Sequence, residues 1–322
     1  MRFSQNSDPA NQIQKALNFA KHSKQKIKIV IPNGKYILNN TLHIYSNTWL
    51  YTSPNTVFIK SSNNRGSMIL NGDSNDNFYN YEGNSNIIID GGIWDANGLF
   101  TPSVIGISHG KNIIIQNTLI KNVMAGHAID CAGNKNVKIR NNKFLGYRKV
   151  KNEVYVEAIQ IDALVSKKVF TGFGSIDFTI TKDITIENNY FGNSYDPGMS
   201  QWGVGVGSHT AGYNIPYSKI IIKNNVFEGM TLSGIKIYNW KNVYIKNNFF
   251  TSCNHGILIN TFDITYSRNE PEIPSKNDLI ISNINIKENQ FKNINISGIL
   301  LNGKQEEYQD EIKSSNNLYI NF

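Results

Sequence analysis

The chain of 322 residues is poor in cysteine and proline, with two Cys and eight Pro in all. Two thiols, Cys131 and Cys253, cannot form a disulfide framework, and no Cys and His spacing typical of a metal site occurs. We expect both cysteines to pack in the interior and no metal site to be present. No apolar run approaches the ~18 residues of a membrane span. The first residues, MRFSQNSDPANQ, do not resemble a signal peptide, so export would use another route, such as phage assembly or lysis, or a leader outside this sequence.

Acidic residues are fewer than basic ones. The chain has 32 Lys and Arg against 24 Asp and Glu, a formal charge of +8 that allows a polyanionic partner. The lysines recur at Lys-Asn positions such as Lys111, Lys135 and Lys241, which we interpret as a solvated coat spread around the surface. The basic cluster and aromatic motif typical of a nucleic-acid site are absent, so no nucleic-acid partner is expected.

The sequence is instead rich in an internal repeat. One phrase, of the form Ile-x-Asn-Asn-x-Phe, is followed each time by a second, Gly/Ala-Ile-x-Ile. Alternating apolar residues in such short runs indicate strands, and stacked coils of strands bury the alternate side chains in a continuous interior. We predict an all-β fold, a single-stranded right-handed parallel β-helix. The first phrase and its variants end at Trp94, Ile120, Phe144, Phe191, Phe227, Phe250 and Phe291, and the second occupies 128–131, 158–161, 203–206, 234–237, 256–259 and 298–301.

Two further patterns complete the predicted architecture. The second Asn of the first phrase should stack as a ladder at a turn. Residues 8–20 should form a short helix, with Asp8 as the N-cap, that covers the first coil. We expect one structural domain, with an N-terminal cap at 1–25, the β-helix at 26–304 and a closing segment at 305–322. The ladder consists of Asn142, Asn189, Asn225, Asn248 and Asn289, and the apolar face of the helix of Ile13, Ala16, Leu17 and Ala20.

Long excursions interrupt the repeat at 145–156, 163–179, 192–201 and 262–277. Loops on a solenoid usually collect on one side and form a binding groove. Sugars stack on aromatic rings, so these loops predict a carbohydrate groove. The aromatic residues that they bring to it are Tyr147, Tyr155, Phe173, Tyr195, Trp202 and Tyr213.

Aligning the second phrases places polar side chains on one outer face, because equivalent strands in successive coils lie about 4.8 Å apart. One outward column then reads Gly106, Asp130, Gln160, Gly205, Lys236 and Leu258, and the column two residues on reads Ser108, Ala132, Asp162, Gly207, Tyr238 and Asn260. The residue ahead of each strand gives His127, Glu157, Trp202, Ser233 and His255, and His209 lies just beyond. We predict Asp130, Glu157 and Asp162 as catalytic residues. The predicted substrate-binding residues are His127, Gln160, Trp202, His209, Lys236 and Tyr238.

The spacing of the acids suggests a reaction. Asp130 and Asp162 differ by one coil and two residues, which puts their Cα atoms about 8 Å apart. Carboxyl groups ~6.5–9.5 Å apart suit an inverting glycosidase, which needs room for a water molecule. Glu157 adds a third carboxylate, and crowding of like charges raises one pKa to give a proton donor.

The helix, the segment VIPNGKYIL, the phrase IIIDGGIWDANG and the Asn-Asn-x-Phe coils together resemble the pectin lyase-like superfamily over nearly the whole chain. That superfamily contains polygalacturonases, pectate lyases, uronan epimerases and phage tailspike depolymerases. The polygalacturonase phrases Asn-Thr-Asp-Gly, Asp-Asp, Gly-His-Gly and Arg-Ile-Lys are mostly replaced here. His127 stands at the first aspartate position, Glu157 keeps one acid of two, Trp202 stands at the histidine position, and Lys236-Ile237-Tyr238 replaces the last phrase. Pectin hydrolysis is therefore not expected, and the remaining acids look more like those of tailspike endoglycosidases.

These patterns predict a polysaccharide-degrading enzyme, an inverting glycoside hydrolase acting on a bacterial cell-surface or exopolysaccharide glycan without a cofactor. One alternative is a polysaccharide lyase or uronan epimerase acting on acidic sugars, with Lys236, His209 or Tyr238 as acid or base and Ca²⁺ held by the carboxylates. A second alternative is a non-catalytic glycan-binding tail module. The location expected is extracellular, on a cell surface or a phage virion, and the protein would be a monomer or a homotrimer.

Overall fold

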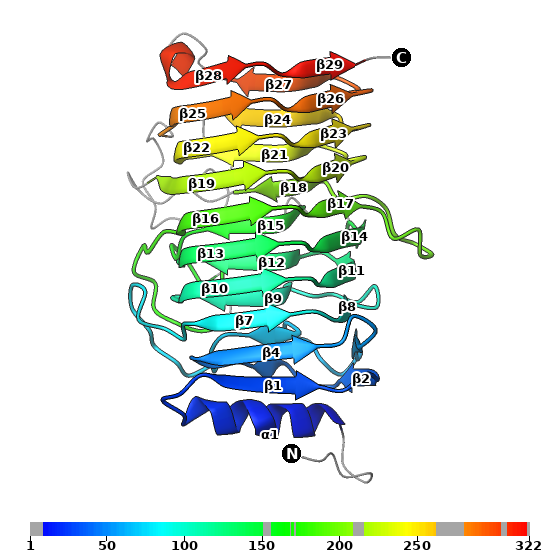
Figure 1. Ribbon diagram of the computed structural model, residues 1–322, viewed down its shortest axis with the longest axis vertical. Coiled ribbons are helices and arrows are strands. Elements are labelled where there is room, and N and C mark those ends of the chain that lie inside the picture. The colour runs from blue at the N-terminus through cyan, green and yellow to red at the C-terminus, as the bar shows by residue number, and fades with distance from the viewer. Residues whose placement is uncertain are drawn as a thin grey trace.

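A computed structural model of the chain describes residues 9–150, 156–167, 169–170, 172–208, 216–261, 280–303 and 308–320. Its strands wind into a right-handed parallel β-helix, with one short helix, α1 (Pro9–Lys21), at its base (Figure 1). Three parallel sheets run the length of the solenoid, of ten, ten and nine strands in the described part of the chain. The predicted fold class is confirmed.

Each coil contributes one strand to each sheet. Sheet A contains β1 (Ile27–Ile31), β4 (Thr48–Thr52), β7 (Ile87–Asp90), β10 (Lys111–Gln116), β13 (Lys135–Arg140), β16 (Lys182–Glu187), β19 (Tyr217–Lys223), β22 (Trp240–Lys246), β25 (Ser282–Lys287) and β28 (Ile312–Ser315). Sheet B contains β2 (Lys35–Leu38), β5 (Val57–Lys60), β8 (Ile93–Asp95), β11 (Leu119–Met124), β14 (Lys143–Arg148), β17 (Tyr190–Gly192), β20 (Val226–Glu228), β23 (Phe249–Thr251), β26 (Gln290–Lys292) and β29 (Leu318–Ile320). Sheet C contains β3 (Leu42–His43), β6 (Ile69–Leu70), β9 (Ser103–Ser108), β12 (His127–Ala132), β15 (Glu157–Asp162), β18 (Val204–Gly207), β21 (Ser233–Tyr238), β24 (His255–Asn260) and β27 (Ser297–Asn302). A single 3-10 turn, η1 (Gln309–Glu311), precedes β28.

The Phe of the repeated phrase builds a stack of aromatic rings inside the solenoid. Neighbouring rings from Phe144 to Phe291 lie 4.6–5.0 Å apart between centroids, close to the rise of one coil. This stack explains the Gly that opens the second phrase. A Cβ at Gly234 would lie 2.5 Å from the ring of Phe250, and one at Gly256 would lie 2.3 Å from the ring of Phe291, so a side chain is excluded there by the stack.

The asparagine ladder is confirmed at the turn between sheets A and B. Asn225, for example, accepts hydrogen bonds at Oδ1 from the backbone N of Asn189 (2.9 Å) and from its Nδ2 (3.0 Å). The residue before each ladder position, such as Asn188 or Asn224, has a φ near +55°, which Asn tolerates better than most side chains. The pair Asn-Asn thus combines a left-handed turn residue with a ladder residue.

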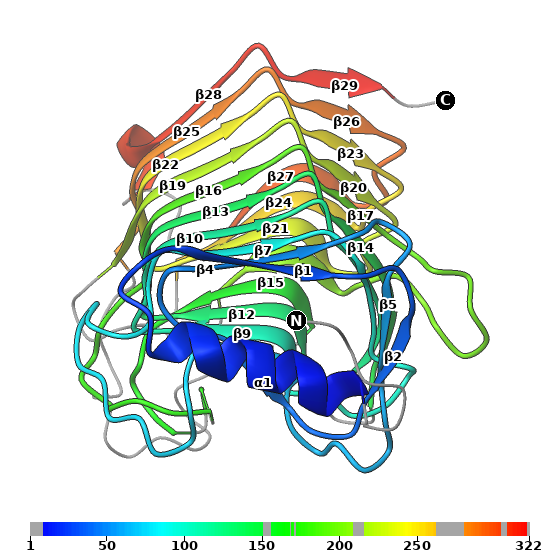
Figure 2. The ribbon, with the colours of Figure 1, turned by 60° about the horizontal axis from the view of Figure 1, so that its bottom comes forward.

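Helix α1 lies across the base of the solenoid, against the first coil (Figure 2). On the inner face of the helix, Ile13 and Leu17 are fully buried and Ala20 is 1% exposed. The predicted cap is confirmed over Pro9–Lys21, whereas Asp8, the expected N-cap, lies outside the described residues. Cys131 and Cys253 are free and buried, as expected of packing residues.

Candidate functional site

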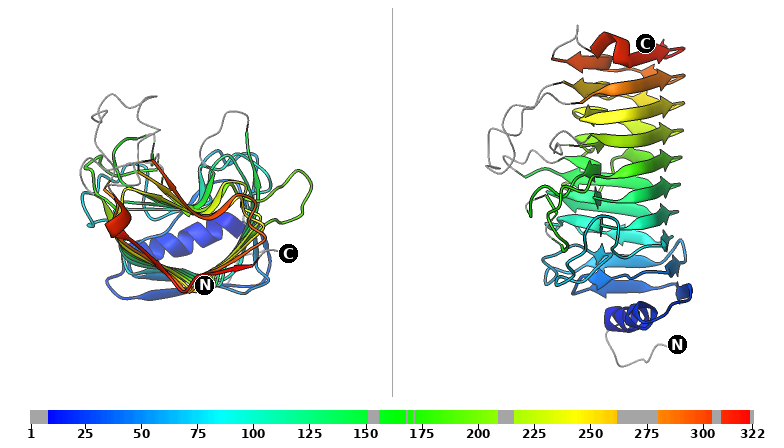
Figure 3. Two further views of the ribbon diagram at one scale, coloured as in Figure 1. Left: turned by 90° about the horizontal axis from the view of Figure 1, so that it is seen from above. Right: turned by 90° about the vertical axis from the view of Figure 1, so that its left-hand side faces the viewer.

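Sheet C is the face beside which the longer described loops gather (Figure 3). Strand pairing sets Asp130 opposite Gln160, and Ala132 opposite Asp162. The predicted offset of one coil and two residues between Asp130 and Asp162 is therefore confirmed. Lys236 follows in the column of Asp130, because it pairs with Gly207, which pairs with Gln160.

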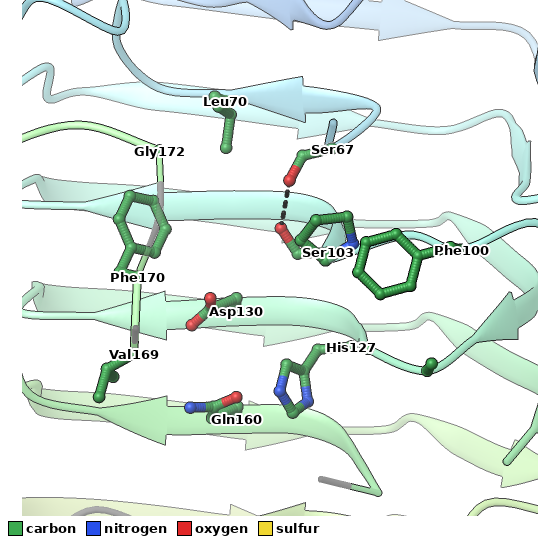
Figure 4. Close-up of a pocket in the computed structure, with 13 residues that line it drawn as sticks. Ser67, Leu70, Phe100, Ser103, His127, Asp130, Gln160, Val169, Phe170 and Gly172 are labelled. Atoms are coloured by element: carbon green, nitrogen blue, oxygen red, sulfur yellow. Dashed lines mark hydrogen bonds between the residues drawn. The ribbon is translucent and has the colours of Figure 1, made fainter. Parts of the chain in front are cut away.

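A pocket of about 320 Å³ opens on this face over β9, β12 and β15 (Figure 4). In the outward column Asp130 lies between Gln160 and Gly106, and Leu70 and Ser103 occupy the space that a side chain at Gly106 would need. A Cβ at Gly106 would lie 2.5 Å from Cδ2 of Leu70 and 2.9 Å from Oγ of Ser103. The residues that line the pocket are Ser67, Leu70, Phe100, Pro102, Ser103, Ala125, Gly126, His127, Asp130, Gln160, Val169, Phe170 and Gly172.

Asp130 is the one carboxylic acid among these lining residues. Its side chain is buried, and its Oδ1 has no hydrogen-bond partner in the described part of the chain. Burial raises the pKa of the Asp130 carboxyl well above its usual range, and the nearby Asp162 carboxylate raises it further. This shift favours the protonated carboxyl, which can both donate and accept a hydrogen bond.

Two polar residues flank Asp130 in the pocket. Nδ1 of His127 lies 2.7 Å from the carbonyl oxygen of Glu157, and because a carbonyl only accepts, that nitrogen carries a proton. Gln160 donates from Nε2 to Oδ2 of Asp162. Both predicted substrate-binding residues thus line the pocket. The backbone of Glu157 in the next coil orients His127, and Asp162 in the same strand orients Gln160.

Glu157 forms a buried ion pair with Lys236. Its Oε1 accepts a hydrogen bond from Nζ of Lys236, and its Oε2 accepts one from the backbone N of Val156 at 3.0 Å. Gly207 lies between the two side chains, and a Cβ there would be 3.1 Å from Cβ of Lys236 and 3.2 Å from Cγ of Glu157. The pair brings together two predicted site residues, but neither lines the pocket.

Asp162 is fully buried and holds its neighbours in place. Its Oδ1 accepts hydrogen bonds from the hydroxyl of Tyr217 (2.7 Å) and from the backbone N of Ala163 (2.9 Å). Together with the bond from Gln160, these donors account for both of its oxygens. Asp162 therefore orients Gln160 and raises the pKa of Asp130 from behind the pocket wall. Sequence reasoning missed Tyr217, because it belongs to sheet A and reaches Asp162 only through the folded coil.

The structure corrects the placement of Trp202. Glu157 pairs with Val204 and Gln160 pairs with Gly207, so the outward column contains Gly207 where we expected Gly205. The alignment was two residues out in this coil, and Trp202 lies before the strand. Its ring is fully buried in the core and stacks on Tyr147 at 4.8 Å between centroids, so it does not face a sugar.

Among the other aromatic residues predicted to face a sugar, Tyr238 and Phe173 are buried and Tyr195 is exposed. Tyr238 is 1% exposed and packs in the core cluster, so it does not present its ring to the pocket as expected. Phe173 is buried in a small cluster behind the lining residue Phe170, and Tyr195 is 78% exposed in the 192–201 loop. Three predicted residues, His209, Tyr155 and Tyr213, lie outside the described residues.

The pocket contains residues that the repeat did not reveal. Ser67 and Ser103 lie on successive coils with their Oγ atoms 2.8 Å apart, and Phe100 covers one side (Figure 4). Phe170 comes from the 163–179 excursion, the predicted loop that does line the pocket. Phe100 and Ser67 lie in connecting segments without the alternation of the strands, so their side chains gave no periodic signal.

Metal-binding clusters and membrane-spanning helices are both lacking among the described residues. No group of three or more His, Cys, Asp or Glu side chains is placed there to hold a metal ion. Across the same residues, no helix is long and apolar enough to cross a membrane.

A parallel β-helix with a polar pocket on one sheet defines a class of solenoid proteins, and comparison with known proteins places the chain in it. The family model described as right handed beta helix region matches residues 84–273. The chain belongs to this family, and its structural neighbours lie in the pectin lyase-like superfamily that the sequence resembled.

Three similar proteins are informative. The chain is 28% identical over 267 residues to plasmin and fibronectin-binding protein A of Streptococcus pneumoniae (strain ATCC BAA-255 / R6), a match that covers 76% of this chain and 37% of that protein. A crystal structure of PfbA, a surface adhesin of Streptococcus pneumoniae, has a TM-score of 0.76 at 21% identity and covers 98% of this chain and 76% of that one. A tailspike protein mutant of the E. coli bacteriophage HK620, solved in complex with a hexasaccharide, has a TM-score of 0.66 at 12% identity and covers 100% of this chain and 54% of that one.

Proposed function

We propose that this chain is an extracellular or cell-surface protein that binds a carbohydrate segment in the pocket on sheet C. The observation that carries the proposal is Asp130, a buried carboxyl with a raised pKa in the pocket lining, one oxygen of which lacks a partner among the described residues. A sugar hydroxyl can supply that partner, because it both donates and accepts hydrogen bonds.

The rest of the lining supports a sugar as the occupant. Carbohydrates present hydroxyls around their edge and C–H groups on their faces, and the pocket offers both kinds of partner. Ser67 and Ser103 supply hydroxyls, and the rings of Phe100 and Phe170 supply apolar surfaces. Binding sites of this kind combine apolar walls with a few placed polar groups.

PfbA supports the surface location, and the tailspike supports the class of ligand. PfbA is described as a surface adhesin, and the tailspike was solved with a hexasaccharide bound. Both share the solenoid with this chain, and the proposed surface location and glycan ligand agree with these descriptions.

Binding is favoured over hydrolysis by the state of the other two acids. An inverting glycosidase needs a second carboxylate that can activate water at the sugar. Glu157 is held in the ion pair with Lys236, and Asp162 is held by hydrogen bonds from Tyr217, Ala163 and Gln160. Hydrolysis is the second candidate function, and Asp130 favours it, because a carboxyl with a raised pKa is the proton donor that the reaction needs.

The proposal is tested by screening the chain against short oligosaccharides from bacterial capsules and exopolysaccharides, followed by calorimetry on the ligand found. Asp130→Ala should weaken binding about tenfold, since a lost hydrogen bond is worth about 1–1.5 kcal/mol. Asp130→Asn should bind within a few-fold of the parent, because it is neutral and still donates. Leu258→Ala, further along the same column and outside the pocket, is the control and should leave affinity unchanged.

The same oligosaccharides separate binding from catalysis. Hydrolysis would release new reducing ends, and elimination would instead raise the ultraviolet absorbance of an unsaturated uronate. We expect neither. Reducing ends that appear with the parent chain and vanish with Asp130→Asn would establish the hydrolase instead, and the absence of binding to every glycan would overturn both candidates.

A further inference from the structure

The outer surface of sheet A, called here the basic face, belongs to strands that hold twelve of the 32 Lys and Arg residues of the chain, more than the strands of either other sheet. Its strands contain twelve Lys and Arg and three Asp and Glu, so that 12 − 3 gives +9 against +8 for the whole chain. The strands of sheet C carry one Lys and three acids, 1 − 3 = −2. The interpretation of the lysines as an evenly spread coat was therefore wrong. The basic residues of the face are Lys28, Lys111, Lys135, Lys138, Arg140, Lys182, Lys219, Lys223, Lys241, Lys246, Lys287 and Lys313.

Strand pairing stacks these side chains in columns of like charge. Lys223, Lys246 and Lys287 are direct neighbours on three successive coils. At the other end of the strands, Lys111 neighbours Lys135, which neighbours Lys182. Equivalent atoms in adjacent strands are only about 4.8 Å apart, so each column concentrates several cations along one line.

This arrangement opposes folding. Like charges directly opposite each other in neighbouring strands destabilise a sheet. Uncharged residues would fit the same columns, since Ser218 and Ser282 occupy two of the positions in the column of Lys241. The repulsion is relieved only in part: Nζ of Lys223 lies 3.0 Å from Glu187, and Nζ of Lys246 lies 3.4 Å from Glu288.

Several of these cations have no acidic partner. Within the described chain, no ion pair involves Lys138, Lys241 or Lys287. Lys138 and Lys241 are exposed, and Lys287 is partly exposed. A polyanion laid along the columns would neutralise them and release the ions that screen them.

The shape of the face indicates the form of the partner. The strands of sheet A present a continuous surface along the solenoid, and the longer described loops gather instead beside sheet C (Figures 1 and 3). An extended chain can lie across such a surface and meet at least one cation in each coil from β10 to β28. We propose that the basic face binds an extended acidic polysaccharide, independently of the pocket on sheet C.

The composition of the face favours a polysaccharide over a nucleic acid. Eleven of the twelve cations are Lys, with Arg140 the exception, whereas Arg is preferred where phosphates or bases are recognised by paired hydrogen bonds. Single-stranded nucleic acid also needs exposed rings on which bases stack. Tyr244 of β22 is 49% exposed, but the rings of Trp49 and Tyr51 are covered by Lys28, whose Nζ lies 4.0 and 4.5 Å from their centroids. One exposed ring does not form a row on which successive bases stack. Carboxylate or sulfate groups on a sugar chain need only the point charges that Lys provides.

The test compares two triple variants of equal charge. Lys241→Gln, Lys246→Gln and Lys287→Gln together remove three cations from the basic face. Lys24→Gln, Lys35→Gln and Lys143→Gln remove three exposed cations from elsewhere on the surface. Heparin and alginate serve as acidic probes, dextran as the neutral one, and duplex DNA as the nucleic acid, all in titrations at several salt concentrations.

We expect the parent chain to bind heparin and alginate, with affinity that falls as salt rises, and not to bind dextran on this face. The basic-face variant should lose affinity about tenfold or more and show a shallower salt dependence, while the control variant stays within about twofold. Thermal unfolding of the basic-face variant should occur at an equal or higher temperature, because like-charge repulsion is removed.

Three results would overturn the proposal. Equal losses in both triple variants would mean that only net charge matters. Tighter binding to duplex DNA than to heparin or alginate would make the partner a nucleic acid. Failure of the parent to bind either acidic probe would leave the basic face without this function. None of these outcomes bears on Asp130 or the pocket, so the proposed function stands or falls separately.

Discussion

At the scale of single residues, the pocket holds a carboxyl whose pKa the fold raises. The pKa of Asp130 is raised by burial and by Asp162, so between the ordinary pKa of aspartate and this raised value the folded chain binds a proton that the unfolded chain has released. Stability then falls as pH rises through that interval. A residue that weakens the fold in this way is a candidate for function, because selection for stability alone would replace it.

Asp130→Asn should therefore stabilise the protein, and more so at higher pH. Below about pH 4 the carboxyl is protonated in both the folded and the unfolded chain, so its replacement by an amide no longer adds to the free energy of unfolding. Above that pH the difference should grow, since a change of one in pKa corresponds to about 1.4 kcal/mol. Apparent Tm values of the variant and the parent, measured between pH 4 and pH 8, should diverge by several degrees with the variant higher.

Asp73→Asn is a control of opposite sign. Burial alone would raise the pKa of Asp73, but hydrogen bonds from Lys21 and Tyr45 hold it below its usual value. Its stabilising effect is present above the unfolded pKa and is lost as pH falls. Asp73→Asn should therefore lower the Tm at neutral pH and approach the parent at low pH. The same pH trend in both variants would show that the site does not raise the pKa of Asp130.

At the scale of strands, the sequence was sufficient for the alternation of side chains but not always for the register. The second phrase predicted which residues of β12, β15 and β21 face outward, because each has one distinctive polar residue between two apolar ones. In GVGVG, at 203–207, the pattern itself repeats every two residues. A shift of two leaves every side chain on the same face, so nothing local distinguished Gly205 from Gly207. Trp202 was therefore placed opposite Glu157, a position that Val204 occupies, and Trp202 lies before the strand in the core.

The asparagine ladder predicts a gradient of sensitivity along the turn. Asn225 is 1% exposed, and its Nδ2 donates to the carbonyl of Ile186 (2.9 Å) while its Oδ1 accepts two bonds from Asn189. Asn225→Ala leaves the buried partners of this side chain without hydrogen bonds, each at a cost of about 1–3 kcal/mol. We therefore expect the free energy of unfolding to fall by roughly 3 kcal/mol or more. Asn317 ends the ladder and is only partly buried, so Asn317→Ala should cost about 1 kcal/mol. Denaturant unfolding of both variants measures the difference, and equal losses would contradict the ladder as a source of stability.

At the scale of the whole molecule, repetition decides what a sequence can reveal. A residue that recurs once per coil must lie on the same face in every coil, because the solenoid repeats its path. The recurring Lys111, Lys135 and Lys241 therefore had to form a column, and their assignment to an even coat failed to apply that rule. The pocket could not be predicted in the same way. Phe100 and Phe170 come from segments that occur only once in the sequence, so the repeat could not indicate where their side chains lie.

The same repetition leaves the two ends of the solenoid without neighbours, which gives α1 a role that the rest of the fold does not fill. Strands β1, β2 and β3 have partners on one side only, and an unpaired edge invites association with another chain. Leu17 is fully buried against the first coil, whereas Phe19, two residues on, is 64% exposed on the outer side of the helix. Leu17→Ala should cost about 2–5 kcal/mol in the first coils, while Phe19→Ala should stay within about 0.5 kcal/mol of the parent.

The Leu17→Ala chain should consequently aggregate at a lower temperature, as followed by light scattering during heating, because loss of the cap exposes the edge before the central coils unfold. The pocket lies further along the solenoid, over β9, β12 and β15. Solenoid coils are stabilised mainly by their immediate neighbours, so glycan binding at temperatures below that transition should be unchanged in this variant. Aggregation that is equal in the Leu17 and Phe19 variants would show that the helix is an appendage and that the first coil protects itself.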